Sequence, residues 1–88
     1  MRNHVFTKRF KRSYKKKDSR KKDDIDDCVR KLLDDASHPG LHTHKIKGKP
    51  GVFEAYVNSS HRLTFEYDEY GRIVLRNNCD HKVLTESP

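Results

Sequence analysis

The stretch DDIDDCVRKLLDDASHPG, residues 23–40, decides the fold class because the hydrophobic pattern changes at its end. Within it, apolar residues recur at the spacing of one helix face: Ile25, Cys28, Val29, Leu32, Leu33 and Ala36. Two aspartates open the stretch, where a helix start favours negative charge, and His38-Pro39-Gly40 ends it. The pattern predicts an amphipathic helix in which Cys28 packs as a small apolar residue.

After this helix the hydrophobic period changes from 3.6 to 2 residues, which is typical of half-buried strands. Four strand candidates follow: Thr43–Lys47, Val52–Val57, Arg62–Tyr67 and Arg72–Asn77. Their connections are short and rich in turn residues, so the strands are expected to form an antiparallel meander. We expect one face of the meander to meet the helices through Leu63, Phe65, Tyr67, Ile73 and Leu75. We expect the opposite face to be lined by Arg62, Thr64, Glu66, Val74 and Arg76.

The segment before residue 23 predicts a short strand and a short helix. HVFT can form the strand, and Thr7 can cap the helix that follows. Phe6, Phe10 and Tyr14 recur at i, i+4 and i+8, which marks one apolar stripe on a basic helix, and a turn is expected around Lys17–Lys22. At 88 residues the chain has room for one core. The fold class is therefore a single α+β domain over residues 1–88, with a short N-terminal strand and a two-helix hairpin packed on a small antiparallel β-sheet (order β-α-α-β-β-β-β).

The charge of the chain points to an anionic partner. The net charge is +7, and residues 1–22 hold eleven of the twenty Lys and Arg against one acid, Asp18. Such a surface is typical of proteins that bind nucleic acid, an acidic protein or a membrane, although solvated helix faces would give the same pattern. The sequence has no run of 18 apolar residues and no apolar signal core, so neither a membrane span nor secretion is expected. Two cysteines are expected to be free thiols in a reducing cytoplasm.

The stretch HTHKIKG, residues 42–48, could serve a metal, an anion or neither. His42-x-His44 and Cys79-x-His81 offer ligand types that suit zinc. Lys45 and Lys47 would lie beside the dication, however, and the pair spacings are not those of structural zinc sites. We therefore predict no metal and no cofactor, with plain surface histidines as a further alternative.

An anion-handling site is the prediction that remains for the sheet face opposite the helices. This face would gather cations from separate strands beside a histidine that follows the last strand: Lys45, Lys47, Arg62, Arg76 and His81. Neighbouring strands lie about 4.8 Å apart, so such cations can converge on one anion. Cations would neutralise a phosphodiester and its transition-state charge, while histidine can move protons near neutral pH.

Four segments in order resemble the RelE/ParE superfamily of toxins from type II toxin–antitoxin systems, and most closely its RelE/YafQ-like mRNA interferase branch. They are HPGLHTHKIKG, GVFEAYVN, HRLTFEYDEYG and IVLRNNCDHKVL, and the likeness covers nearly the whole chain. The resemblance implies a cytoplasmic toxin that cleaves messenger RNA on the ribosome without a metal. In such enzymes the ribose 2′-OH attacks the adjacent phosphate. The implied partners are messenger RNA, ribosomal RNA and a cognate antitoxin whose segment wraps over the domain.

The resemblance also implies roles for individual residues. His81 matches the histidine after the last strand of YafQ-like toxins, a general acid or base. Arg62 matches the RelE-like arginine that holds the scissile phosphate, and His44 resembles a second YafQ-like histidine. Lys45 and Lys47 resemble the paired strand lysines of RelE.

Two positions and the C-terminal segment depart from the family pattern. Cys79 stands where many relatives have glycine, Ser60 stands where YafQ-like toxins have aspartate, and the C-terminal VLTESP lacks an aromatic residue that some members carry. These departures bear on turnover and codon preference more than on fold.

The basic N-terminal helix is expected to bind RNA, and two functions other than RNA cleavage are also compatible with the sequence. Lys15 and Lys16 are expected to add affinity for ribosomal RNA. The alternatives are a ParE-like toxin that inhibits gyrase by surface binding, and a basic module that binds RNA or ribosomes without cutting.

Overall fold

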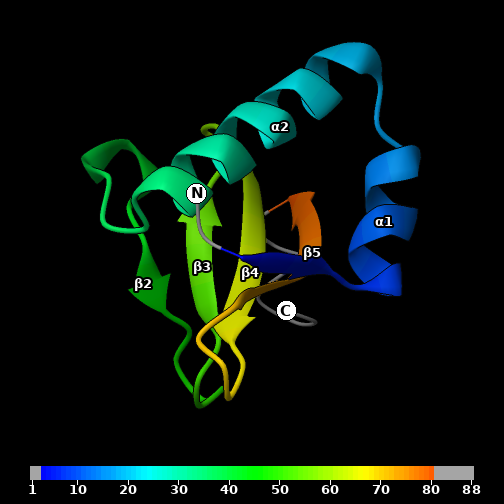
Figure 1. Cartoon of the computed structure of the whole chain (residues 1–88). Coiled ribbons are helices and arrows are strands. Elements are labelled where there is room, and N and C mark those ends of the chain that lie inside the picture. Colours follow the sequence, from blue (N-terminus) through cyan, green and yellow to red (C-terminus); the bar gives the residue numbers. More distant parts are fainter. Residues whose placement is uncertain (1–2, 81–88) are drawn as a thin grey trace.

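The computed structural model describes residues 3–80, which form two helices and one five-stranded sheet (Figure 1). The elements in chain order are β1 (His4–Phe6), α1 (Lys8–Lys15), α2 (Ser19–Asp34), a 3₁₀ turn η1 (Pro39–Leu41), β2 (His44–Lys45), β3 (Phe53–Tyr56), β4 (His61–Tyr67) and β5 (Ile73–Asp80). This order confirms the predicted α+β class. None of the described helices is long and apolar enough to cross a membrane.

The sheet has the strand order β1-β5-β4-β3-β2. Strands β2 to β5 form the predicted antiparallel meander. Strand β1 pairs with β5 at the other edge of the sheet and runs parallel to it, and both helices and strands β2 to β4 lie between the two strands in the chain. Figure 1 shows α2 lying across the sheet and α1 standing beside β5. This leaves one face of the sheet turned away from α2.

Strand lengths differ from the predicted ranges at both ends of the meander. β2 is reduced to two residues, whereas β5 runs to Asp80 instead of ending at Asn77. The longer β5 pairs with the start of β4, where Arg62 lies opposite Cys79. The sheet is therefore extended around Arg62.

The second helix begins earlier than the aspartate pair predicted. The Asp18 side chain accepts a hydrogen bond from the Lys21 amide at 2.9 Å, so Asp18 is the N-cap and the helix starts at Ser19. The turn expected around Lys17–Lys22 is correspondingly shorter. The Thr7 cap of α1 is confirmed, because its hydroxyl accepts from the Phe10 amide.

The core lies between α2, α1 and the inner face of the sheet. It contains inward strand residues and the predicted helix stripe up to Leu33: Phe10, Ile25, Cys28, Val29, Leu32, Leu33, Ala55, Leu63, Phe65, Ile73 and Leu75. Ala36, also predicted in the stripe, is only partly buried, because α2 ends at Asp34. Cys28 donates to the Tyr56 carbonyl at 3.3 Å, and burial raises the pKa of its thiol to about 12. Tyr67, expected to face inward, is 38% exposed at the end of this face. Both cysteines are free thiols.

A register shift between Thr64 and Phe65 divides the β4–β5 ladder. Thr64 lies opposite Asn77 and Phe65 lies opposite Leu75, so Arg76 is the extra residue. Beyond the shift, Asn78 lies opposite the buried Leu63, and its side chain donates to the Phe10 carbonyl at 3.1 Å. The shift thus ties β5 to α1 through a polar side chain.

Candidate functional site

The sheet face turned away from α2 is centred on Glu54 of β3, a residue that sequence reasoning missed. Glu54 lies between His44 of β2 and Thr64 of β4 in the strand register. Its Oε1 is 3.4 Å from Nε of Arg62 and 3.9 Å from Nε2 of His44. One carboxylate oxygen therefore stands between two residues that the sequence selects for phosphate chemistry.

Glu54 had a signal in the sequence. In GVFEAYV, it falls between Phe53 and Ala55, which are hydrophobic and contribute to the core side of β3. Strand alternation therefore places Glu54 on the outer face. The outer face was expected to be open, but Glu54, Arg62 and Thr64 are only 4%, 7% and 0% exposed. That expectation is wrong at the centre of the face.

Arg62 is held from three sides. Its Nη1 donates to the carbonyls of Asn58 at 2.6 Å and His61 at 3.0 Å. Its Cζ lies 3.5 Å from the ring centroid of Tyr56, the register partner of Arg62 on β3. Stacking of a guanidinium on an aromatic face is favourable when both are desolvated. These contacts fix the orientation of the guanidinium group, and its Nε faces Glu54.

His44 is oriented by its own backbone neighbourhood. Its Nδ1 is 2.8 Å from the carbonyl oxygen of His42, and a carbonyl can only accept, so Nδ1 carries the hydrogen. In the neutral imidazole this leaves Nε2 with a lone pair on the side of Glu54. The His42 ring lies 4.7 Å from that of Tyr56, so His42 is not a purely solvated side chain.

Arg76 also has an acidic partner. Its Nη1 donates to Oε1 of Glu66 at 2.9 Å, and both side chains are about one third exposed. Both sheet arginines that the sequence assigns to phosphate are therefore paired with a carboxylate of a neighbouring strand. The described face is charge-compensated rather than an open cluster of cations.

The predicted lysines lie at the margins. Lys45 is exposed on β2, the edge strand, and Lys47 is exposed in the turn that follows. Lys45 lies opposite Phe53 in the register, so strand alternation puts it on the core side of the sheet and not on the Glu54 face, where it was expected. Lys15 and Lys16 are exposed at the C-terminal end of α1, beside β5. His81 lies outside the described residues.

Within residues 3–80, no cluster of three His, Cys, Asp or Glu could hold a metal ion.

His61 is a further histidine at the start of β4. Its pKa is lowered from the ordinary value, chiefly because burial penalises the charged ring and also because Lys17 and Lys21 are near. Alternation along β4 places His61 on the side of Leu63, opposite to the side of Arg62. It is therefore not part of the Glu54 face.

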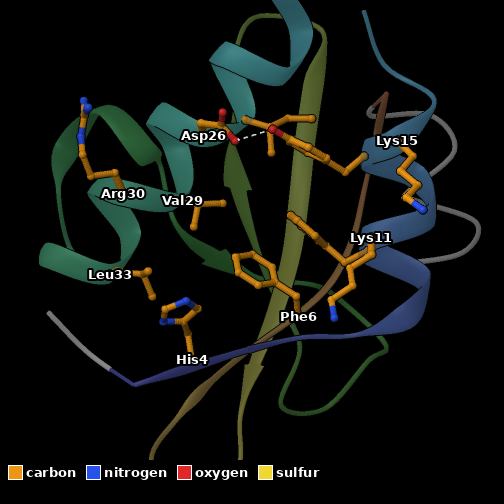
Figure 2. A pocket seen from close by; sticks show the side chains of 11 residues that line it. His4, Phe6, Lys11, Lys15, Asp26, Val29, Arg30 and Leu33 are labelled. Carbon is orange, nitrogen blue, oxygen red and sulfur yellow. Dashed lines mark hydrogen bonds between the residues drawn. The ribbon is translucent and has the colours of Figure 1, made fainter. Parts of the chain in front are cut away.

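A second surface feature is a groove of about 600 Å³ between β1, α1 and α2 (Figure 2). Its apolar lining comes from both helices and β1: Phe6, Phe10, Tyr14, Ile25, Val29 and Leu33. Lys11, Lys15 and Arg30 also line it, and among the described residues Asp26 is its one acid. The Tyr14 hydroxyl donates to Asp26 at 2.9 Å, a bond that, with burial, raises the pKa of Tyr14. The groove thus combines an apolar interior with a largely basic rim.

Comparison with known proteins identifies the fold. No protein-family model and no curated relative matches the chain in sequence. Among solved structures, YafQ from E. coli strain BL21(DE3) superimposes with a TM-score of 0.77 at 12% identity, over 96% of this chain and 98% of that chain. The YoeB/ParE toxin from Agrobacterium tumefaciens gives 0.74 at 19% identity, over 90% and 98%. The RelE toxin fold in the RelB-RelE antitoxin-toxin complex from Methanococcus jannaschii gives 0.73 at 19% identity, over 96% and 99%. The chain therefore has the fold of the RelE/ParE superfamily of toxins, as its sequence resemblance predicted.

Proposed function

We propose that this protein is the toxin of a toxin–antitoxin system and acts as a ribosome-dependent, metal-independent endoribonuclease. The observation that carries the proposal is the superposition on RelE, YoeB/ParE and YafQ toxins over at least 90% of the chain. The chain itself supports the proposal, because Arg62 and His44 both approach Oε1 of Glu54 on the same face of the sheet. We place the protein in the cytoplasm, because messenger RNA is translated there on ribosomes.

The proposed reaction is transesterification within the RNA chain. The ribose 2′-oxygen forms a bond to the adjacent phosphorus, the bond from phosphorus to the 5′-oxygen breaks, and a cyclic phosphate and a free 5′-OH result. Arg62 binds the scissile phosphate and offsets its added negative charge. Nε2 of His44 accepts the 2′-OH proton, and His81 donates a proton to the departing 5′-oxygen. Lys45 on the edge strand and Lys47 in the turn after it contact neighbouring phosphates.

Two further surfaces serve the proposed partners. The groove between α1 and α2 suits an antitoxin segment that carries apolar side chains flanked by acids, because its interior is apolar and Lys11, Lys15 and Arg30 border it. Lys15 and Lys16 also add attraction to ribosomal RNA. The messenger RNA itself would lie across the Glu54 face.

The pairing of both sheet arginines with acids favours a second candidate. A charge-compensated face suits a protein that acts by surface binding, either a ParE-like gyrase inhibitor or a non-catalytic module that binds RNA or ribosomes. Mapping transcript 5′ ends after induction in growing cells separates the candidates. New ends at defined codon positions support the endoribonuclease. DNA damage with intact messages supports gyrase inhibition, and ribosome binding with neither supports the non-catalytic module.

A further inference from the structure

Glu54 occupies the position that a bound phosphate would need. Its Oε1 is 3.4 Å from Nε of Arg62, and the side chains are only 6% and 8% exposed. Nη1 of Arg62 is already engaged by the Asn58 and His61 carbonyls. Arginine binds an oxyanion in bidentate fashion through one edge of its planar fork. With Nη1 engaged, the edge that includes Nε is left for a phosphate, and Glu54 faces it.

Two buried polar atoms beside Glu54 lack a hydrogen-bond partner. Among the described residues, neither Nε of Arg62 nor Oγ1 of Thr64 has one, and Thr64 is the register partner of Glu54. The approach of Glu54 to Nε is thus an ion pair without a formed hydrogen bond. Buried polar groups are normally satisfied, so a pair of unsatisfied atoms next to a candidate site points to a ligand that completes them. An oxyanion can accept from both a guanidinium N–H and a hydroxyl.

We propose that Glu54 is an internal counter-ion of the RNA site, which holds the place of the scissile phosphate at Nε of Arg62 until RNA arrives. The inference rests on the proposed function. Glu54 is a positioning residue: it keeps the guanidinium oriented in the free protein, and it yields the Nε edge to the substrate. This arrangement lowers the affinity for RNA, because a phosphate meets a carboxylate of the same sign at the position where it must bind.

Replacement of Glu54 by glutamine separates this role from a structural one. Glu54→Gln keeps the shape and an acceptor oxygen but removes the charge. If Glu54 only supported the fold, the variant would bind RNA more weakly or with unchanged affinity. If Glu54 competes with the phosphate, the variant would bind RNA more tightly. Glu69→Gln is the matched control, since Glu69 is exposed in the β4–β5 turn and loses the same charge.

The probe is a fluorescein-labelled 2′-O-methyl RNA hexamer, which binds but cannot be cut because it has no free 2′-OH. Fluorescence anisotropy at fixed salt should show that Glu54→Gln binds about three- to tenfold more tightly than the wild type. Glu69→Gln should bind within about twofold of the wild type, because charges far from the ligand are screened. The gain should vanish when Arg62→Lys is combined with Glu54→Gln, since lysine lacks the fork.

A measurement on the unmodified protein covers the case in which a variant fails to fold. The Nε–Hε resonance of Arg62, assigned through bonds from the Arg62 backbone in the isotope-labelled wild type, should shift when the hexamer is added, because Nε exchanges a carboxylate for a phosphate. Arg72 provides an internal comparison and should shift less, since its Nε already donates to Asp68 in the β4–β5 turn.

The outcomes distinguish this inference from the function on which it rests. If Arg62→Lys weakens the hexamer affinity but Glu54→Gln binds no more tightly than Glu69→Gln, the counter-ion role is wrong and the phosphate contact stands. If the wild type and Arg62→Lys bind equally, at any affinity, the phosphate contact of the proposed function is wrong and the inference falls with it. Tighter binding by Glu54→Gln that depends on Arg62 supports both.

Discussion

Arg62 of β4 and Glu54 of β3 form a buried ion pair, with Nε 3.4 Å from Oε1 and each side chain less than one tenth exposed. The pair joins two neighbouring strands at the centre of the candidate site. Desolvation of two charges is expensive, so such pairs contribute little net stability but are costly to break from one side. Arg62, which the resemblance assigns to the scissile phosphate, is therefore also a residue whose loss would lower the stability of the fold.

The first prediction concerns the stability of this pair. Arg62→Ala should lower the free energy of unfolding by about 3–5 kcal/mol, because it leaves the Glu54 carboxylate buried without its partner. The double variant Arg62→Met, Glu54→Leu should recover most of that loss, because both charges are gone. Urea unfolding of the two variants measures both values. A double variant less stable than Arg62→Ala would show that the pair stabilises the fold.

Strand alternation in the sequence indicates that Arg62 and Glu54 lie on the outer face of the sheet, but it does not indicate that they contact each other. Alternation places Arg62 and Glu54 on the same face, and the turn residues place β3 and β4 side by side. Which acid meets which cation depends on the register, and hairpin register depends on the conformation of the Asn58–Ser60 turn. The shift at Thr64 depends on packing across strands, which no local pattern records. The expected open cluster of cations was wrong for that reason.

For the second helix, the sequence predicted the buried face but not the residue at which the helix begins. The stripe from Ile25 to Leu33 was predicted because helix periodicity is a property of neighbouring residues. The start of α2 was misplaced because several acids precede the stripe and only one can act as the N-cap. Asp18 fills that position because its carboxylate reaches the Lys21 amide.

The second prediction concerns the proton-transfer residues. His44→Gln and His81→Gln should each lower the rate of messenger RNA cleavage on purified ribosomes by about 10²–10⁴-fold, since each would remove a group that moves a proton in the transition state. His38→Gln is the control, because His38 is exposed in the connection between α2 and β2. Undiminished cleavage by one variant would remove that histidine from the mechanism.

The third prediction follows from the pKa of Cys28. Burial raises this pKa from 9.0 to about 12, so the native thiol is not ionised at pH 8 and should resist iodoacetamide. Cys79 is partly exposed and should be alkylated first, which mass spectrometry of intact protein and its peptides can follow. Faster alkylation of Cys28 than of Cys79 under native conditions would contradict the burial of Cys28.

The fourth prediction is the pH dependence that the same thiol imposes. The folded-state pKa of Cys28 lies above the unfolded value, so its contribution to stability is complete below about pH 9 and is lost as the pH rises through the window from 9.0 to about 12. Cys28→Ala should flatten the fall of the free energy of unfolding in this window, as measured by urea unfolding at several pH values. If the free energy of unfolding of the variant falls with pH as steeply as that of the wild type, groups other than Cys28 cause the loss of stability at alkaline pH.

The fifth prediction concerns the basic end of α1. Lys15→Gln combined with Lys16→Gln should weaken co-sedimentation with ribosomes while changing the thermal unfolding midpoint little, because both side chains are exposed and no negative charge is added at the C-terminal end of α1. The dependence of the binding constant on salt should also become shallower, by about 0.7 in the log–log slope for each single-strand phosphate that the variant no longer neutralises. An unchanged slope would place the cations that bind ribosomal RNA elsewhere on the surface.

The most direct test of the central claim is cleavage of a defined messenger RNA on purified ribosomes by the wild type and by Arg62→Lys, with chemical analysis of the new ends. If Arg62 binds the scissile phosphate, the wild type leaves 2′,3′-cyclic phosphate and 5′-OH ends, and a folded Arg62→Lys variant cuts at least about 10²-fold more slowly. Equal cutting by both proteins, or no new ends with the wild type, would contradict the claim.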